Sequence, residues 1–420
     1  MNNIKFIEGI GFIPNDWAVK KADELCSKIT KGTTPPKEDI VNNSHIPFLR
    51  VNNLTFDGVL DVNSGFIFVS EAAHRSVLSR SIAYKNDILM NIVGPPLGKT
   101  ALLNDNFDEY NLNQAIVIYR VSSVDVARLF FFFFLKSVIA QNWLQSHSKK
   151  TSGQQNLTIE VCKNLPIPIP PLPEQIKIAE ILSTWDNAIN TVQKLLANSQ
   201  QQKKALMQQL LTAKKRFAGF DGEWEEKRLG DISDMNSGGT PKSSVPDFYN
   251  GDIPWVSIAD MTKQGKFINS TERYITGLGM ENSSARLYPK NTILYAMYAS
   301  IGESSIANVE CCSSQAILGI RSKKELYYEF LYFYLCFLKE EIKLQGQQGT
   351  QSNLNAGMVK DFKVKLPSLD EQQKIAAVLT IADQEIDSLR AQLNHLKQEK
   401  KALMQQLLTG KRRVKIEEAA

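Results

Sequence analysis

The chain has 420 residues, of which 43% are hydrophobic and 22% charged, and its formal net charge at pH 7 is +5. This composition is typical of a soluble protein with two or three domains, and the small charge excess does not by itself indicate a nucleic-acid-binding protein. The N-terminus lacks a signal-peptide pattern, the most apolar run (129–135) is too short to span a bilayer, and the five cysteines form no CxxC pair. We therefore expect a cytoplasmic protein without structural disulfides or a zinc site.

The first half of the chain opens with short motifs that return in the second half in the same order. Trp17 is matched by Trp224, and Gly-Thr-Thr-Pro at residues 32–35 is matched by Gly-Gly-Thr-Pro at 238–241. Runs rich in β-branched and aromatic residues predict strands at residues 46–51 and 253–258, and further strand-like runs begin at 87 and 292. This order of motifs predicts two similar globular units.

Each half continues with Gln-Ala-Ile, at residues 114–116 and 315–317, and with an aromatic segment, at 129–139 and 330–342, that we interpret as a buried helix. Polar loops at residues 148–155 and 345–352 then precede the strand that leads to the next helix. The amide and hydroxyl side chains of these loops suit base edges and phosphates, and they suit ordinary exposed loops equally well.

The two halves share a framework and differ in their loops. From residues 156 and 353 onward the offset between them is constant at 197 as far as Thr212, whereas the alignment drifts elsewhere. Two modules that read different targets are expected to diverge in this way, and so is a duplicated scaffold whose loops have drifted.

A heptad pattern ends each half, and both copies finish with the same ten residues, at 203–212 and 400–409. Apolar residues advance by alternating steps of four and three, which places them on one narrow face of a helix and predicts a coiled coil. The expected seam consists of Ile178, Leu182, Trp185, Ile189, Val192, Leu196, Leu206 and Leu210 in the first helix, and of Ile375, Leu379, Ile386, Leu389, Leu393, Leu396, Leu403 and Leu407 in the second.

We expect the two helices to pair with each other in antiparallel orientation. A helix from Glu174 to Thr212 would be about 58 Å long, and a parallel partner would force the domain between the helices to bridge that whole length. The seam lysines, Lys203 and Lys400, either fix the register or extend out of a frayed seam. Prolines at 168–173, a capping-box pattern at 368–371 and Gly410 predict sharp helix boundaries.

These features predict an α+β fold in which two similar globular domains lie at opposite ends of an intramolecular antiparallel two-helix coiled coil, with pseudo-two-fold repetition. The expected parts are a first domain at residues 1–163, a linker and central helix at 164–216, a second domain at 217–366, and a C-terminal helix and tail at 367–420.

No motif for catalysis stands out. The sequence from Gly94 to Thr100 is one residue too short for a nucleotide-binding P-loop, and its counterpart has Glu303 in place of the lysine. The four histidines have no repeated partners, and we find neither HExxH nor GxSxG. We therefore expect no catalytic residues, no metal site and no cofactor in this chain.

The complete arrangement resembles the specificity subunit of type I restriction-modification systems. The resemblance rests on the Gly-Thr-Pro loops, on Leu-Pro-Glu-Gln at 172–175 and Leu-Asp-Glu-Gln at 369–372, and on the heptad helices with identical ends. It implies a non-catalytic subunit whose two target recognition domains each bind one half of a bipartite, asymmetric site on double-stranded DNA. It also implies that the helices set the spacing and bind two methyltransferase subunits, which carry S-adenosylmethionine, and that restriction subunits supply ATP- and magnesium-dependent translocation.

The alternative function is a coiled-coil adaptor that holds two protein-binding modules apart. Copurification with a methyltransferase and protection of a split DNA site would distinguish the two functions.

The residues that contact DNA are expected on paired loops of the two domains. The candidates for DNA contact are Thr33, Thr34, Lys37, Lys99, Thr100, Gln154 and Gln155 in the first domain, and Thr240, Lys242, Ser243, Ser304, Gln348, Thr350 and Gln351 in the second.

Overall fold

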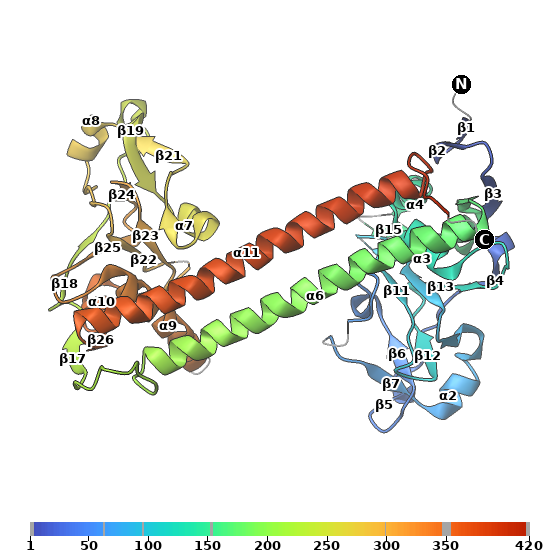
Figure 1. Ribbon diagram of the computed structural model, residues 1–420, viewed down its shortest axis with the longest axis horizontal. Coiled ribbons are helices and arrows are strands. Elements are labelled where there is room, and N and C mark those ends of the chain that lie inside the picture. The colour runs from blue at the N-terminus through green and yellow to red at the C-terminus, as the bar shows by residue number, and fades with distance from the viewer. Residues whose placement is uncertain are drawn as a thin grey trace. The chain divides into compact units, whose positions relative to one another are not determined.

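The computed structural model describes residues 4–61, 64–94, 96–151, 154–298, 300–346 and 354–416. The chain forms two compact units, one of residues 1–192 with 392–420 and one of residues 193–391. We call them the first and second units. Both unit boundaries fall inside long helices, so each unit consists of a globular domain and parts of two helices (Figure 1).

The first unit is built on an antiparallel sheet with the strand order β11-β9-β13-β4, next to a mixed sheet in which β6 and β12 are parallel. A third sheet, β10-β15-β14, contains the antiparallel pair formed by residues 149–151 and 154–156. The strands are β1 Ile4–Ile7, β2 Gly11–Pro14, β3 Ala18–Lys21, β4 Cys26–Lys31, β5 Ile40–Val41, β6 Pro47–Leu49, β7 Ile67–Val69, β8 Ala83–Tyr84, β9 Ile88–Asn91, β10 Val93–Gly94, β11 Thr100–Leu102, β12 Glu109–Leu112, β13 Ile116–Val121, β14 Lys149–Thr151, β15 Gln154–Asn156 and β16 Pro166–Ile169. The helices of this domain are α1 Ala22–Leu25, α2 Glu71–Arg75, α3 Arg128–Lys136, α4 Val138–Ser146 and α5 Ile159–Asn164.

The second unit repeats this framework with the strand order β18-β25-β22-β23-β20 and with a parallel pair, β19 and β24, in the neighbouring sheet. Its strands are β17 Glu225–Arg228, β18 Ser233–Ser237, β19 Tyr249–Val256, β20 Phe267–Ile268, β21 Arg273–Ile275, β22 Ile293–Ala296, β23 Ser304–Ala307, β24 Cys312–Ser313, β25 Ile317–Ser322 and β26 Lys363–Leu366. Its helices are α7 Ile258–Gln264, α8 Gly277–Glu281, α9 Tyr328–Gly346 and α10 Ala356–Lys360. The matching strand order in the two units confirms the internal repeat.

Two helices of 39 residues each, α6 Leu172–Leu210 and α11 Leu369–Leu407, follow the two domains. In the first unit the start of α6 lies beside the end of α11, and in the second unit the end of α6 lies beside the start of α11 (Figure 1). The antiparallel pairing expected from the heptads together with the chain connectivity is therefore present in each unit. The α+β class predicted from the sequence is also confirmed.

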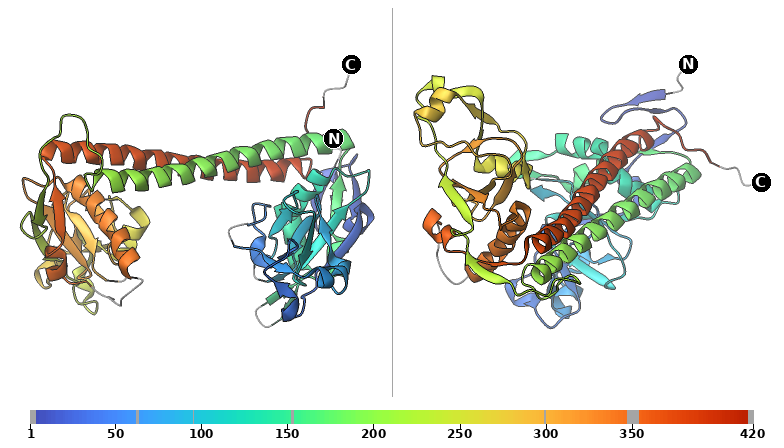
Figure 2. Two further views of the ribbon diagram at one scale, coloured as in Figure 1. Left: turned by 90° about the horizontal axis from the view of Figure 1, so that it is seen from below. Right: turned by 60° about the vertical axis from the view of Figure 1, so that its left-hand side comes forward.

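The helices share a hydrophobic core with the sheet of each unit. In the first unit Ile178 and Leu182 of α6 and Leu407 of α11 belong to the same buried cluster as Phe131 and Tyr119. In the second unit Ile375, Leu379 and Leu210 pack in the cluster of Phe330 and Tyr295. Figure 2 shows the paired helices along one side of each domain. Because large aromatic side chains fill these cores, each helix end is fixed to its domain.

The local structure differs from the sequence predictions at several places. The first aromatic segment is not one helix, because Ser137 caps α4 through Ala140 N and separates it from α3. Residues 149–151 and 154–156 form a hairpin where a loop was expected. The strand predicted from residue 253 begins at Tyr249, and residue 258 already starts α7. The first long helix starts at Leu172 instead of Glu174.

Candidate nucleic-acid interface and helix junctions

The Gly-Thr-Pro loop packs in the same way in both units. Gly32 N donates to Ile116 O at 3.0 Å, and Gly238 N donates to Ile317 O at 3.0 Å. A Cβ atom on Gly32 would lie 1.9 Å from Leu112 O, and one on Gly238 would lie 2.3 Å from a backbone oxygen of the facing segment. Only glycine allows this close approach of two backbone segments.

The threonine of each loop contacts the glutamine of the repeated Gln-Ala-Ile motif. The hydroxyl of Thr34 donates to Gln114 Oε1, and the hydroxyl of Thr240 donates to Gln315 Oε1. These four side chains are exposed. The Gly-Thr-Pro loop and the Gln-Ala-Ile motif are thus parts of one surface in each unit. The sequence did not reveal this contact, because about 80 residues separate the two motifs in the first unit.

The other candidates for DNA contact lie in varied surroundings. Lys37, Lys242 and Ser243 are exposed, Thr33 accepts a hydrogen bond from Arg80 Nε at 3.0 Å, and Lys99 is half-buried. Gln155 lies in β15, half-buried, and Gln154 begins the same strand. Three candidates, Gln348, Thr350 and Gln351, lie outside the described residues.

Two candidate hydroxyls face the protein interior. Thr100 in β11 is 0% exposed, and Ser304 in β23 is 4% exposed and donates to Gly302 O at 3.3 Å. Neither side chain is accessible to a duplex in this structure. We expected both on paired loops, whereas each belongs to a strand of the main sheet of its unit.

The segment that resembled a P-loop is a turn held by an asparagine. Asn91 Nδ2 donates to Val93 O at 3.2 Å and to Pro96 O at 3.0 Å, and its Oδ1 accepts from Lys99 N at 2.8 Å. A strand, β11, follows this turn. A phosphate-binding P-loop needs a helix N-terminus at that position, so this segment does not have the geometry of a nucleotide site.

A buried glutamate joins the start of α6 to the chain segment after α11. Glu174 is 1% exposed and accepts hydrogen bonds from Arg413 Nε and an Arg413 terminal nitrogen, both at 2.7 Å. The indole of Trp17 donates to the same carboxylate at 3.3 Å. Arg413 also forms two bonds to Asp16, at 3.0 and 2.9 Å, and these hydrogen bonds hold the pKa of Asp16 below its ordinary value. We call this group the first clasp.

The second unit contains an equivalent group, the second clasp. Glu371 is 1% exposed and accepts from Arg216 at 3.0 and 2.8 Å, and Trp224 donates to it at 3.2 Å. The sequence suggested a capping box here, but the Glu371 carboxylate binds Arg216. Of the expected cap only the donation from Glu371 N to the Ser368 hydroxyl, at 3.4 Å, is present.

The residue after each glutamate ties the helix to its domain. Gln175 accepts from Ala127 N at 2.8 Å and donates to Asp125 O and Pro170 O, both at 2.8 Å. Gln372 repeats the three bonds with the backbone of its own domain. The Glu-Gln pair shared by the two helix starts therefore has a structural explanation. The sequence carried a usable signal, since Glu174, Gln175 and the arginine after the helix all return at an offset of 197.

The seam residues predicted from the heptads are all buried or half-buried. Each seam lysine pairs with an aspartate of the other helix within its unit, Lys400 with Asp186 and Lys203 with Asp383. Lys400 Nζ also lies 5.2 Å from the ring centre of Phe133. Lys400 is buried and Lys203 is half-buried, and each pair forms at one helix register only, which favours a role in fixing the register.

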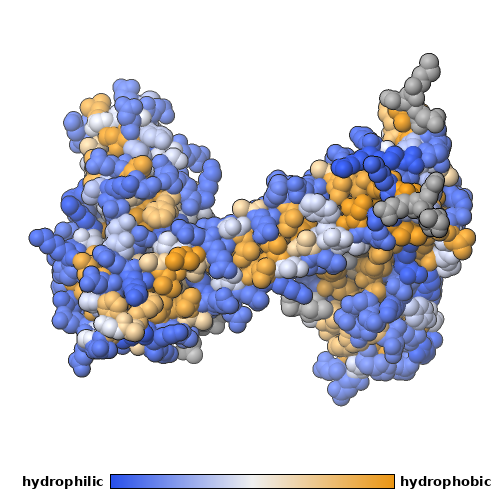
Figure 3. Space-filling model, in the orientation of Figure 1, coloured by the Kyte–Doolittle hydropathy of each residue, from blue (hydrophilic) through white to orange (hydrophobic). Residues whose placement is uncertain are grey.

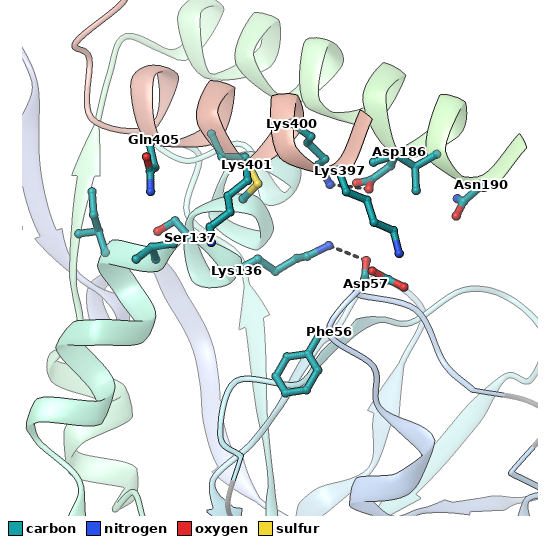
Figure 4. A pocket seen from close by; sticks show the side chains of 14 residues that line it. Phe56, Asp57, Lys136, Ser137, Asp186, Asn190, Lys397, Lys400, Lys401 and Gln405 are labelled. Atoms are coloured by element: carbon teal, nitrogen blue, oxygen red, sulfur yellow. Dashed lines mark hydrogen bonds and ion pairs between the residues drawn. The ribbon is translucent and has the colours of Figure 1, made fainter. Parts of the chain in front are cut away.

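A pocket of about 290 Å³ lies in the first unit between the paired helices and the domain. Figure 4 shows Lys136 pointing toward Asp57 and Lys400 toward Asp186, with Lys397 and Lys401 on the rim. Lys136 Nζ donates to Asp57 O at 2.5 Å. Burial, together with the neighbouring charge of Lys400, lowers the pKa of Lys136 to about 8. The rim is thus cationic, and Val138, Ile139, Ile189 and Met404 form an apolar lining.

Several apolar side chains of the long helices lie outside the seam and remain exposed. Ile381 of α11 is 64% exposed, and Leu195 of α6 is 48% exposed. Figure 3 shows hydrophobic residues between hydrophilic ones on the visible face of these helices.

The buried cysteines and His74 have structural surroundings. Burial raises the pKa of the Cys26, Cys311 and Cys312 thiols to about 12, which keeps them protonated and unreactive. His74 is fully buried between Asn111 Oδ1, at 2.6 Å, and Glu109 Oε2, at 2.9 Å. Within the described parts of the chain no set of metal-ligating side chains gathers, and no helix is both long and apolar enough to cross a membrane.

Comparison with known proteins identifies relatives along the whole chain. It is 26% identical over 433 residues to the type I restriction enzyme MjaVIII specificity subunit of Methanocaldococcus jannaschii, with 98% of this chain and 96% of the relative covered. It is 28% identical over 229 residues to the EcoR124I/EcoR124II specificity subunit of Escherichia coli, with 52% and 55% covered.

Solved structures share the fold. The S subunit of a type I restriction-modification system from M. genitalium matches with a TM-score of 0.57 and 18% identity over 97% of this chain and 98% of that one. A chain from a structure of a type I R-M system described for complex assembly and conformational transition matches with a TM-score of 0.59 and 20% identity, with 95% and 99% covered. The family described as type I restriction modification DNA specificity domain matches twice, at residues 14–198 and 221–398. The chain therefore belongs to the type I restriction-modification DNA specificity family and carries two copies of its domain.

Proposed function

We propose that the domain of each unit binds one half of a bipartite, asymmetric site on double-stranded DNA and that the paired helices set the spacing between the two halves. Family membership makes the chain the DNA-recognition component of a restriction-modification complex and not its catalytic component. The observation that carries the proposal is the repeat itself. Two specificity domains share one framework, and each is fixed to a long helix by a clasp and a glutamine.

Physical linkage explains why two modest binding surfaces suffice. Once one domain has bound its half-site, the second domain searches a small volume, and its effective concentration at the other half-site is high when the spacing matches. The ion pairs of Lys400 with Asp186 and of Lys203 with Asp383, in which Lys400 is buried and the other three side chains are half-buried, oppose sliding of one helix along the other. A fixed register converts helix length into a required gap between half-sites.

The paired helices are also the proposed binding site for two methyltransferase subunits. The exposed apolar residues Ile381 and Leu195 and the cationic rim formed by Lys397 and Lys401 support this part of the proposal. S-adenosylmethionine would be bound by those methyltransferase subunits, and ATP and magnesium by the restriction subunits. The side chains of this chain would position DNA and partners.

Methylation mapping tests the proposed function directly. DNA from cells that carry the complete system should contain modified adenines within one split motif, and exchange of residues 1–150 for those of another family member should change one half of that motif only. A motif that is continuous, or a change in both halves, would contradict the proposal. Copurification with two protein partners but no protection of split DNA would favour an adaptor.

A further inference from the structure

A matched set of exposed donors surrounds the Gly-Thr-Pro loop of each unit. Gln114 and Gln315 accept the threonine hydroxyls through Oε1, which turns their amide nitrogens outward. Within the described part of the chain, neither amide nitrogen has a hydrogen-bond partner. The glutamines were visible in the sequence as a repeated motif, but the proposed function gives them no role so far.

An exposed arginine stands next to each loop. In the first unit Arg80 Nε donates to Thr33 Oγ1 at 3.0 Å. In the second unit a terminal nitrogen of Arg286 donates to Asn236 Oδ1 at 3.1 Å, on the strand that leads into the loop. Neither arginine pairs with a carboxylate among the described residues. Each loop therefore presents a positive charge together with neutral amide donors.

We propose that the guanidinium of Arg80 with the Gln114 amide nitrogen in the first unit, and the guanidinium of Arg286 with the Gln315 amide nitrogen in the second, each bind a phosphate of the DNA backbone, while Thr34 and Thr240 orient the glutamines. This inference rests on the proposed function, because it assumes that the two domains contact DNA. The sets hold the duplex in the same way in both half-sites, while the divergent loops read the bases.

The repetition of the set argues for a target that both half-sites share. The two domains differ in their loops, for example in α7 of the second unit, where the first has only the single turn at Val51–Asn53. A residue kept in two modules that read different sequences contributes nothing to the difference between them. The sugar-phosphate backbone is common to every half-site, and its contacts fix position and orientation.

The chemistry of the set also favours phosphate over a base edge. A glutamine reads adenine by donating to N7 and accepting from the N6 amino group at the same time. With Oε1 already accepting from the threonine, the glutamine offers donors, and the arginine has donors only. Phosphate oxygens accept and do not donate, so the outward amide nitrogen of the glutamine and the guanidinium of the arginine match a phosphate.

The test uses the full chain assembled with its methyltransferase subunits. It measures the affinity of this complex for the mapped bipartite duplex and for duplexes that carry single base changes in either half. Gln114→Ala and Gln315→Ala should each weaken binding about fivefold for every duplex alike, the effect of one hydrogen bond. Gln114→Glu, which keeps the shape and adds a negative charge, should weaken binding more than Gln114→Ala. Arg80→Ala should reduce the slope of log affinity against log salt by about one.

Gln145→Ala, at an exposed position of α4, is the matched control and should leave binding unchanged. Unchanged melting temperatures of the variants would show that the loops remain folded. Relaxed specificity at one base position would overturn the proposal in favour of base reading, and unchanged affinity in all variants would overturn it outright. If the wild-type complex protected no bipartite site, the proposed function would fail first, and that result is distinct from either outcome with the variants.

Discussion

Truncating the arginine of the first clasp should destabilise the helix ends more than neutralising its glutamate. In Arg413→Ala, Glu174, which is 1% exposed in the wild-type chain, loses its cation and keeps only the Trp17 indole as donor. An uncompensated buried charge costs about 3 to 5 kcal/mol, and the remaining indole bond places this variant near about 3 kcal/mol. In Glu174→Gln, Arg413 is 44% exposed and keeps its two bonds to Asp16, so we expect a cost of about 1 kcal/mol.

Hydrogen exchange of the full chain, followed by mass spectrometry of peptides from residues 172–182 and 400–407, measures these costs locally. The double variant Arg413→Ala with Glu174→Gln should be more stable than Arg413→Ala alone, because no buried charge remains. Arg412→Ala, at the exposed neighbouring position, should exchange like the wild type. Equal costs for the two single variants, or additive costs in the double variant, would refute the reasoning that the buried carboxylate dominates this junction.

Three further substitutions test other parts of the structure. Gly32→Ala should destabilise the first unit by about 3 kcal/mol, because the new Cβ would meet Leu112 O. The melting temperature of Gly32→Ala should fall, whereas that of the control Gly222→Ala, where nothing lies within 4 Å of the new Cβ, should not change. Ala213 follows α6 with φ +59°, at the position that Gly410 (φ +67°) occupies after α11. A left-handed backbone strains alanine but not glycine, so Ala213→Gly should raise the free energy of unfolding in urea by about 1 kcal/mol. An unchanged free energy of unfolding would contradict this backbone strain. Lys136→Met should stabilise the chain by roughly 2 kcal/mol at pH 7. Between the folded-state pKa of Lys136, about 8, and its ordinary value, the folded wild-type chain binds fewer protons at Lys136 than the unfolded chain does. The stability of the wild-type chain therefore rises with pH in this range. Melting curves should show that the advantage of Lys136→Met disappears by about pH 10.5.

The sequence predicted the repeated and periodic parts of the fold well. Heptad spacing determines which side of a helix is apolar, so the seam from Ile178 to Leu407 followed from local pattern alone. The antiparallel pairing followed from chain connectivity. Strand boundaries were less accurate, since residue 258 looked like the end of a strand but caps and packing make it the start of α7.

Contacts between distant residues could not be predicted from local pattern. The pairing of Thr34 with Gln114 and the joining of Trp17, Glu174 and Arg413 depend on the complete fold, although the constant offset of 197 marked two of these positions as repeated. Burial removed Thr100 and Ser304 from the accessible candidates because a residue near a glycine can belong either to a loop or to a central strand.

The most direct test of the account changes the length of both helices and maps the methylated motif. Seven residues inserted between Val192 and Gln193 and seven between Leu393 and Asn394 preserve the heptad phase and the register set by Lys400 and Asp186. Each heptad adds about 10.5 Å of helix, equivalent to about three base pairs of B-form DNA. We predict that the gap in the motif grows by about three base pairs while both half-sequences stay the same. An unchanged gap in an active, folded complex would contradict the claim that the helices set the spacing.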